Sequence, residues 1–140
     1  MKTLIPIDGS AFTQRLLDYV VTHRTMLGPE PQVTLLTVVG AIPPHVTHFV
    51  PHDVVTGYYR DQAEAVLAPA LTTLRAAGIE AKTLYEHGFA PEVIADLASA
   101  QAFDLLVMGS HGHSAIGGLV LGSVVTGTLA RCKTPVLVLR

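Results

Sequence analysis

The chain has 140 residues, 49% of them hydrophobic, which is about the length of one domain and enough apolar surface for a core of its own. Its net charge is −2 and its 9 basic residues are scattered, so neither nucleic acid nor an anionic membrane is an expected partner. No stretch reaches the ~20 uninterrupted apolar residues of a membrane helix, and the lone Cys132 and the lack of a signal pattern favour a cytoplasmic setting.

The first part of the chain predicts a strand, a helix and a second strand. Residues 3–7 are short and apolar and end at Asp8-Gly9-Ser10, a turn in which the Ser10 hydroxyl can cap the next helix. Apolar residues at helical spacing then predict an amphipathic helix that Gly28-Pro29 ends. Residues 32–39 carry apolar side chains without alternation, which is typical of a strand covered on both faces of a parallel sheet.

The middle of the chain predicts a long loop and a long helix. The loop, residues 40–53, contains three prolines and the histidines His45, His48 and His52, and its length indicates a lid or a mobile segment. Residues 54–77 predict a helix, which Pro69 is expected to kink or break.

The remaining elements alternate between strand and helix. We expect strands at residues 80–85, 105–108 and 136–139 and helices at residues 91–99 and 123–132. This alternation predicts a single α/β domain over residues 1–140, with a doubly wound, five-stranded parallel sheet in the order 3-2-1-4-5 and helices on both faces. Ligands of such sheets bind beyond the carboxyl ends of the strands at the switch point, here between the first and fourth strands.

Glycines cluster where the fourth strand ends and the last helix begins. Gly109-Ser110-His111-Gly112 follows the apolar residues 105–108, and Gly122-Ser123 comes after nine more residues. Glycines let backbone approach a ligand closely, and the free N–H groups of a helix N-terminus attract phosphate oxygens. The stretch lacks the lysine of a P-loop. The alternative interpretation is that the glycines only allow tight turns and that no ligand binds there.

The spacing Gly109-x-x-Gly112, nine residues, Gly122-Ser123 resembles the motif of the universal stress protein family in its ATP-binding branch. The opening Pro6-Ile7-Asp8-Gly9-Ser10 and the ending Pro135-Val136-Leu137-Val138-Leu139 are also similar to that family. The resemblance implies the strand order given above, in a Rossmann-like fold related to the adenine nucleotide alpha hydrolases. It also implies ATP as the ligand and a homodimer formed through residues 136–139.

The resemblance assigns site residues to both ends of the nucleotide. Adenine and ribose contacts would fall on Pro6, Asp8, Val38 and Met108, with Val39 as the alternative to Val38. Phosphate contacts would fall on Gly109, Gly112, His113, Gly122, Ser123, Val124 and Val125. Asp8 could accept hydrogen bonds from ribose hydroxyls or form an Asx turn before the first helix. Many members carry arginine where this chain has His113, so phosphate binding is expected to differ in strength and pH dependence.

A protein metal site is not favoured by the histidine spacing. His111 and His113, with His45, His48 and His52, match no standard zinc pattern, so we interpret the loop histidines as solvated side chains. A divalent cation such as Mg²⁺ or Mn²⁺ would arrive with the triphosphate, held by phosphate oxygens, water and Ser123 or Asp8.

Three functions remain open from the sequence. Residues 109–130 contain no Lys, Arg, Asp, Glu, Gln or Asn, so this stretch is suited to binding a nucleotide but poorly equipped to cleave it. The first hypothesis is an ATP-binding regulatory protein of the universal stress type. The alternatives are a slow ATPase and a nucleotide-free dimeric scaffold of the same fold.

Overall fold

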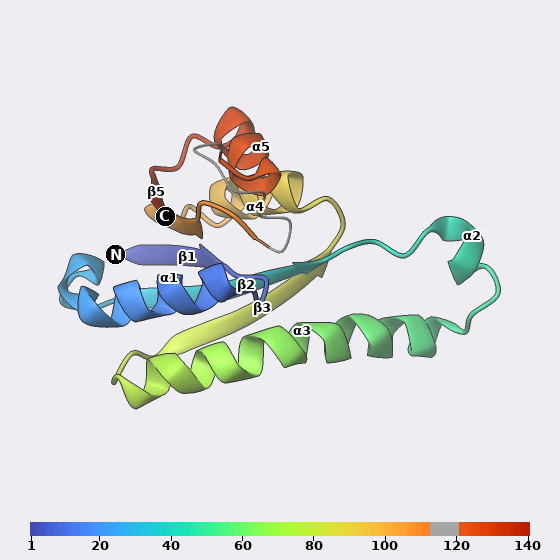
Figure 1. Ribbon diagram of the computed structural model, residues 1–140. Helices are drawn as coiled ribbons and strands as arrows, with labels where there is room; N and C mark the ends of the chain where they lie inside the picture. The colour runs from blue at the N-terminus through green and yellow to red at the C-terminus, as the bar shows by residue number, and fades with distance from the viewer. Residues whose placement is uncertain (113–120) are drawn as a thin grey trace.

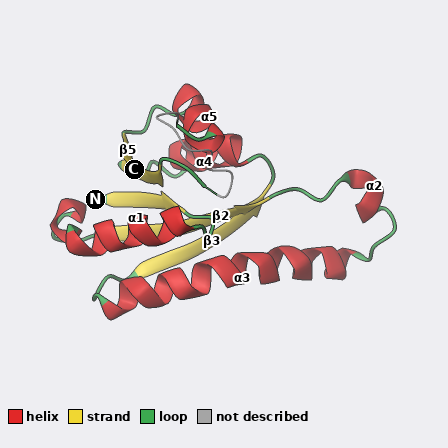
Figure 2. Cartoon of the chain, viewed as in Figure 1, coloured by secondary structure: helices red, strands yellow, loops and turns green. Residues whose placement is uncertain are grey.

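The computed structural model describes residues 1–112 and 121–140, which form one parallel sheet with helices on both faces (Figures 1 and 2). The strands in chain order are β1 (Lys2–Pro6), β2 (Gln32–Val39), β3 (Ala81–His87), β4 (Leu105–Gly109) and β5 (Val136–Leu139). The helices are α1 (Ala11–Thr22), the 3-10 helix η1 (Arg24–Leu27), α2 (Pro44–Thr47), α3 (His52–Ala76), α4 (Ala90–Ala100) and α5 (Ser123–Arg131). None of the helices in these two ranges is long and apolar enough to cross a membrane.

The strand order is β3-β2-β1-β4-β5, and all neighbouring strands are parallel. This order confirms the prediction from the alternating pattern. The chain winds outward from β1 through β2 to β3, then crosses back to place β4 and β5 on the other side. The carboxyl ends of β1 and β4 therefore lie side by side at the switch point, where a parallel sheet opens a crevice.

Two apolar clusters cover the two faces of the sheet. Leu4 and Ile5 in β1 are fully buried and point to opposite faces, because side chains alternate along a strand. Ile5 belongs to the cluster that includes Leu16 of α1 and Leu74 of α3. Leu4 belongs to the cluster that includes Ile94 of α4, together with a residue of α5. Helices α1 and α3 thus pack on one face and α4 and α5 on the other, and the sheet is doubly wound (Figure 1).

Of the kink or break predicted at Pro69, the break is wrong, because α3 continues through Pro69 as one helix of 25 residues. Pro69 and Ala65 both lie on the exposed side of this helix. The carbonyl of Ala65, which loses its usual N–H donor at Pro69, can therefore be solvated by water.

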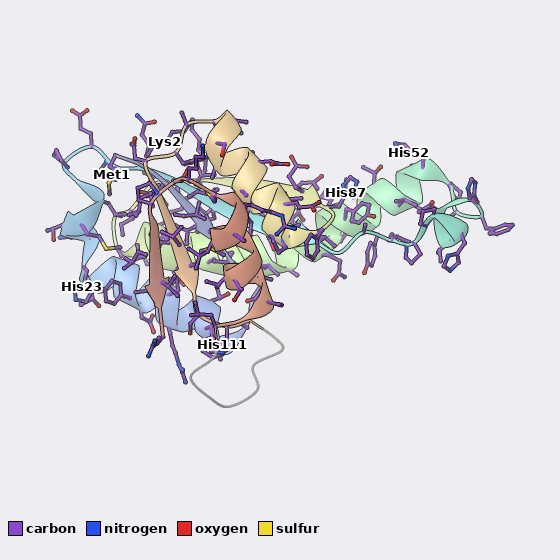
Figure 3. All side chains as sticks on the ribbon, turned by 90° about the horizontal axis from the view of Figure 1, so that it is seen from above. Met1, Lys2, His23, His52, His87 and His111 are labelled. Atoms are coloured by element: carbon purple, nitrogen blue, oxygen red, sulfur yellow. The ribbon has the colours of Figure 1, made fainter. Side chains whose placement is uncertain are left out.

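The predicted loop at residues 40–53 contains structure of its own. Its middle forms the short helix α2, and α3 starts at His52, so both extend beyond the sheet (Figures 1 and 3). At the base of this extension the backbone N–H of Ile42 donates to the Tyr59 hydroxyl at 2.8 Å, and the Tyr59 ring stacks on His87 with centroids 4.5 Å apart. His45, His48 and His52 are all exposed. Within residues 1–112 and 121–140, no group of three or more His, Cys, Asp or Glu side chains could hold a metal ion.

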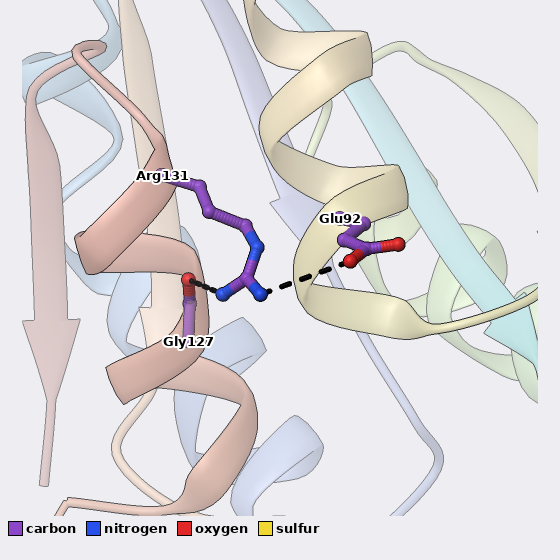
Figure 4. Close-up of polar contacts among 3 residues, drawn as sticks. All are labelled: Glu92, Gly127 and Arg131. Carbon is purple, nitrogen blue, oxygen red and sulfur yellow. Dashed lines mark hydrogen bonds and ion pairs between the residues drawn. The ribbon is translucent and has the colours of Figure 1, made fainter.

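The contact between α4 and α5 depends on a glycine. A Cβ atom added to Gly127 in α5 would lie 2.8 Å from Cβ and 2.9 Å from Cγ of Pro91 in α4. Beside this contact, Arg131 donates to the Gly127 carbonyl at 3.1 Å and pairs with Glu92 at 3.7 Å (Figure 4). The Pro91 ring is rigid, so a larger residue at 127 would push the two helices apart.

We expect Gly127→Ala to lower the free energy of unfolding by about 1–2 kcal/mol, because overpacking of about 1–3 kcal/mol exceeds the gain in helix propensity of about 1 kcal/mol. Gly57 in α3 is the matched control, since a Cβ atom there meets only Arg60 at an ordinary 3.7 Å. Gly57→Ala should therefore raise stability by about 0.5–1 kcal/mol. Urea denaturation measures both variants. A stabilised Gly127→Ala variant would contradict the tight helix contact.

Candidate functional site

A pocket of about 220 Å³ opens at the carboxyl ends of β1 and β4. Its walls come from both faces of the sheet, because α1 leaves β1 on one face and α5 packs on the other. The lining residues are Pro6, Ile7, Asp8, Phe12, Thr13, Leu16, Leu36, Val38, Ala90, Ile94, Met108, Gly109, His111, Gly112, Gly122, Ser123, Val124 and Val125.

All of the predicted site residues that the structure describes lie in this one pocket. His113 lies outside the described residues. Of the two candidates at the end of β2, Val38 lines the pocket, while Val39 packs against the cluster on the opposite face. The segments that the sequence analysis placed together are therefore adjacent in the fold.

One half of the pocket is an apolar slot between β4 and α4. Met108 is 3% exposed and Ile94 is 2% exposed, and both face it together with Leu36 and Ala90. The sequence analysis did not assign Leu36, Ala90 or Ile94 to the site. Period-two alternation along β2 could have found Leu36, since it lies two residues before Val38 on the same face. A slot with these walls suits a flat, apolar-faced ring.

Asp8 forms the turn between β1 and α1. Its Oδ1 atom accepts hydrogen bonds from the Ser10 N–H and from the Thr13 hydroxyl, both at 3.0 Å. The Thr13 Oγ1 atom in turn accepts from the N–H groups of Asp8 at 3.2 Å and Gly9 at 3.1 Å. The Asx-turn role is thus realised. The predicted capping bond from the Ser10 side chain is absent. The Thr13 hydroxyl instead ties the turn before the helix to its first turn, through the N–H groups of Asp8 and Gly9.

Two glycines bring backbone segments together at the mouth of the pocket. A Cβ atom on Gly112 would overlap Oδ2 of Asp8, so only glycine fits beside this carboxylate. The Gly122 N–H donates to the Ser110 carbonyl at 2.7 Å, and a Cβ atom on Gly122 would lie 3.0 Å from that same oxygen. The loop after β4 is thereby joined directly to the start of α5.

The N-terminus of α5 faces the pocket. Ser123, Val124 and Val125 form its first turn and line the cavity, and the first intrahelical bond to Gly122 comes from the Thr126 N–H at 3.0 Å. Backbone N–H groups in a first helical turn have no acceptor within the helix, and the helix dipole is positive there. This half of the pocket is therefore suited to an anion.

His111 is a lining residue that the sequence analysis did not assign to the site. Its Nδ1 atom lies 3.0 Å from the Ser110 hydroxyl, and its ring packs on Phe12 with centroids 5.4 Å apart. These two contacts fix the imidazole at the end of the sheet, far from the extension that carries His52 (Figure 3).

Comparisons with known proteins find relatives over the whole length of the chain. The model of the universal stress protein family matches residues 1–140. Universal stress protein YxiE of Bacillus subtilis is 28% identical over 149 residues, covering 99% of this chain and 98% of YxiE. Universal stress protein Slr1230 of Synechocystis is 30% identical over 141 residues, covering 99% of this chain and 42% of Slr1230, so the chain spans less than half of that relative.

Solved structures share the fold. Protein MJ0577 of Methanocaldococcus jannaschii matches with a TM-score of 0.83 at 26% identity, covering 99% of this chain and 94% of MJ0577. The universal stress protein from Archaeoglobus fulgidus in complex with dAMP has a TM-score of 0.69 at 17% identity, covering 100% and 98% of the two chains. A universal stress protein family protein from Arabidopsis thaliana with AMP bound has a TM-score of 0.69 at 13% identity, covering 99% and 90%.

We expect Asp8→Ala to lower the free energy of unfolding by about 1–2 kcal/mol, because two hydrogen bonds at the start of α1 lose their acceptor. Asp8→Asn keeps the Oδ1 acceptor and should retain most of this stability. Asp18→Ala is the control within the same helix, since it removes only the exposed 2.8 Å bond from Gln14, worth a few tenths of a kcal/mol. Equal losses in Asp8→Ala and Asp18→Ala, measured in urea, would contradict the turn assignment.

Proposed function

The chain belongs to the universal stress protein family, and we propose that it is a regulatory member that binds ATP at the carboxyl ends of β1 and β4. The observation that carries this proposal is the union of an apolar slot and a helix N-terminus in one pocket. A nucleotide likewise has an apolar, flat base at one end and anionic phosphates at the other. The conformation of the protein, or the partner that it binds, would then depend on the bound nucleotide.

The base and sugar would occupy the half of the pocket near β1. Adenine would lie in the slot beside Pro6, Val38 and Met108, with Ile94 closing it from α4. The ribose would lie at Asp8, whose Oδ1 atom holds the turn while Oδ2 faces Gly112. A ribose hydroxyl can donate to a carboxylate that already accepts other hydrogen bonds, because each oxygen has two acceptor positions. Both roles weighed for Asp8 are therefore compatible.

The phosphates would lie between the loop after β4 and the first turn of α5. Gly109, Gly112 and Gly122 leave room for close backbone approach, and the N–H groups of Ser123, Val124 and Val125 supply donors. We assign His113 to the phosphates as well, by position in the motif. Mg²⁺ or Mn²⁺ would be held mainly by phosphate oxygens and water, with Ser123 or Asp8 as the protein ligand.

Nucleotides in related structures support this assignment. The Archaeoglobus protein holds dAMP, the Arabidopsis protein holds AMP, and a further universal stress protein was solved with cAMP. All three share the fold of this chain, and adenine is common to their ligands. Binding rather than rapid turnover is proposed, because residues 109–130 contain no Lys or Arg to stabilise charge on the γ-phosphate and no Asp, Glu, Gln or Asn to orient an attacking water. We place the protein in the cytoplasm.

Wild-type protein should bind Mg-ATP with a dissociation constant in the micromolar range, measured by calorimetric titration. Gly122→Val should weaken this binding at least tenfold, because the new side chain meets the Ser110 carbonyl and enters the phosphate half of the pocket. Gly40→Val is the matched control, since a Cβ atom at Gly40 meets nothing within 4 Å.

The absence of binding heat at millimolar ATP in the wild type would overturn the proposed function. Wild-type affinity in Gly122→Val would show that the phosphates bind elsewhere.

We also propose that two copies form a homodimer through β5. This strand is at the edge of the sheet, and its residues Val136–Leu139 are uncharged and only partly buried. The Pro135 carbonyl accepts from the Leu106 N–H of β4 at 2.8 Å, and the Leu139 carbonyl accepts from the Ser110 N–H just after β4 at 2.6 Å. The alternate residues Val136 and Val138 therefore direct their N–H and C=O groups outward. An open apolar edge of this kind is stabilised by antiparallel pairing with a second copy.

Val138→Pro should convert the dimer to a monomer, because proline removes an outward N–H while the bonds to β4 remain. Val138→Ala is the control, since it shortens the side chain but keeps the N–H group. Light scattering measures the mass. The wild type and Val138→Ala should have about twice the chain mass of 14.8 kDa, and Val138→Pro should have the chain mass. A wild-type mass of 14.8 kDa would contradict the proposed interface.

A further inference from the structure

A second cavity of about 220 Å³ adjoins the nucleotide pocket. It lies between α1 and β5, and Phe12 and Leu16 line both cavities, so the two are neighbours across one pair of side chains. Its other walls include Arg15, Tyr19 and Arg140. Two cationic side chains thus lie next to a pocket whose own glycine loop has none.

Arg15 is held at the boundary between the two cavities. Its guanidinium lies over the Phe12 ring, 5.3 Å from the centroid, and the same ring packs against His111. Phe12 also lies against Gly109, where a Cβ atom would be 3.4 Å from Cβ of Phe12. Arg15 therefore lies close to the start of the loop that leads from Gly109 to Gly112.

Arg140 is brought to the same corner by the register of the sheet. Gly109 pairs with Leu139, and the Ser110 N–H donates to the Leu139 carbonyl at 2.6 Å. The residue after Leu139 therefore starts beside the loop that leads from Ser110 to His111. No spacing in the sequence indicates this proximity, because about 30 residues separate Arg140 from the loop along the chain.

Both arginines are available to an anion. Within the described ranges 1–112 and 121–140, neither Arg15 nor Arg140 forms an ion pair with a carboxylate, and both are exposed. Asp8 is the acidic residue among the side chains that line the two cavities, and its carboxylate faces Gly112 and the turn before α1. Two guanidinium groups thus lie on the side of the corner away from Asp8.

We propose that Arg15 and Arg140 bind the terminal phosphates of ATP, so that the chain distinguishes ATP from AMP. This inference rests on the proposed function, because it assumes that the α-phosphate lies at the start of α5. The β- and γ-phosphates then extend past His111 and Phe12 toward the second cavity. Guanidinium groups offer planar, paired N–H donors that match phosphate oxygens and remain charged at all physiological pH values.

Calorimetric titration with ATP and AMP tests the proposal in the wild type, Arg15→Ala, Arg140→Ala and Arg75→Ala. Loss of one charge-assisted contact should weaken ATP binding about tenfold in Arg15→Ala and in Arg140→Ala. AMP binding should stay within about twofold of wild type, since AMP has no terminal phosphates. Arg75 is an exposed arginine in α3 that lines neither cavity, so Arg75→Ala controls for the loss of net charge. Arg15→Lys should recover part of the ATP affinity.

The outcomes separate this inference from the proposed function. Wild-type protein that binds neither nucleotide would overturn both. Wild-type protein that binds ATP, with no change in Arg15→Ala, would overturn only the inference. Equal weakening of ATP and AMP in Arg15→Ala would also overturn it, because the arginine would then act through the packing of Phe12. Light scattering on the same samples shows whether Arg140→Ala changes the assembly, and Arg15→Ala decides the question if it does.

Discussion

The site depends on close backbone contact at the carboxyl ends of β1 and β4. The Asp8 carboxylate occupies the space that a side chain on Gly112 would need, and the Ser110 carbonyl occupies the space that a side chain on Gly122 would need. The turn after β1, the loop after β4 and the residue before α5 therefore meet closely because neither Gly112 nor Gly122 carries a side chain. Thr13 fixes one side of this junction by accepting two backbone N–H donors and donating to Asp8. A larger residue at either glycine would separate parts of the pocket that come from distant segments.

This junction divides the pocket into chemically different halves. The half toward α4 is apolar because the strands β2 and β4 present Leu36, Val38 and Met108 to the same face. The half toward α5 is rich in backbone N–H groups because a helix begins there. Cationic charge is absent from residues 109–130 but present on α1 and after β5. In the proposed complex, the loop and the start of α5 bind phosphate through backbone N–H groups, and the two arginines bind the outer phosphates.

Most of the fold could be predicted from the sequence because the apolar spacing and the turn residues of each segment agree with the sheet topology of the whole chain. The ends of β2 and β5 match the prediction to the residue. Alternation of strands and helices predicts the parallel sheet, and the observed strand order is one that suits this pattern and that the family resemblance implies. Pro69 predicted a kink or break, but α3 has no break there, and the exposed side of the helix lets water solvate the Ala65 carbonyl. Residues of the candidate site could be predicted only at the positions that the glycine motif and the family resemblance assign. Thr13, Arg15 and Arg140 were missed because turn geometry, a cation–π contact and sheet register bring them there, and none of these leaves a periodic pattern.

Whether ATP occupies the pocket at the junction can be measured by an NMR titration of ¹⁵N-labelled protein with Mg-ATP. We expect the largest amide shifts at Gly109, Gly112, Gly122 and Ser123, while amides of the extension near His48 and His52 stay unchanged. The absence of amide shifts at millimolar Mg-ATP would contradict ATP binding at this pocket. Shifts confined to the extension would contradict it equally, because they would place the nucleotide far from the carboxyl ends of β1 and β4.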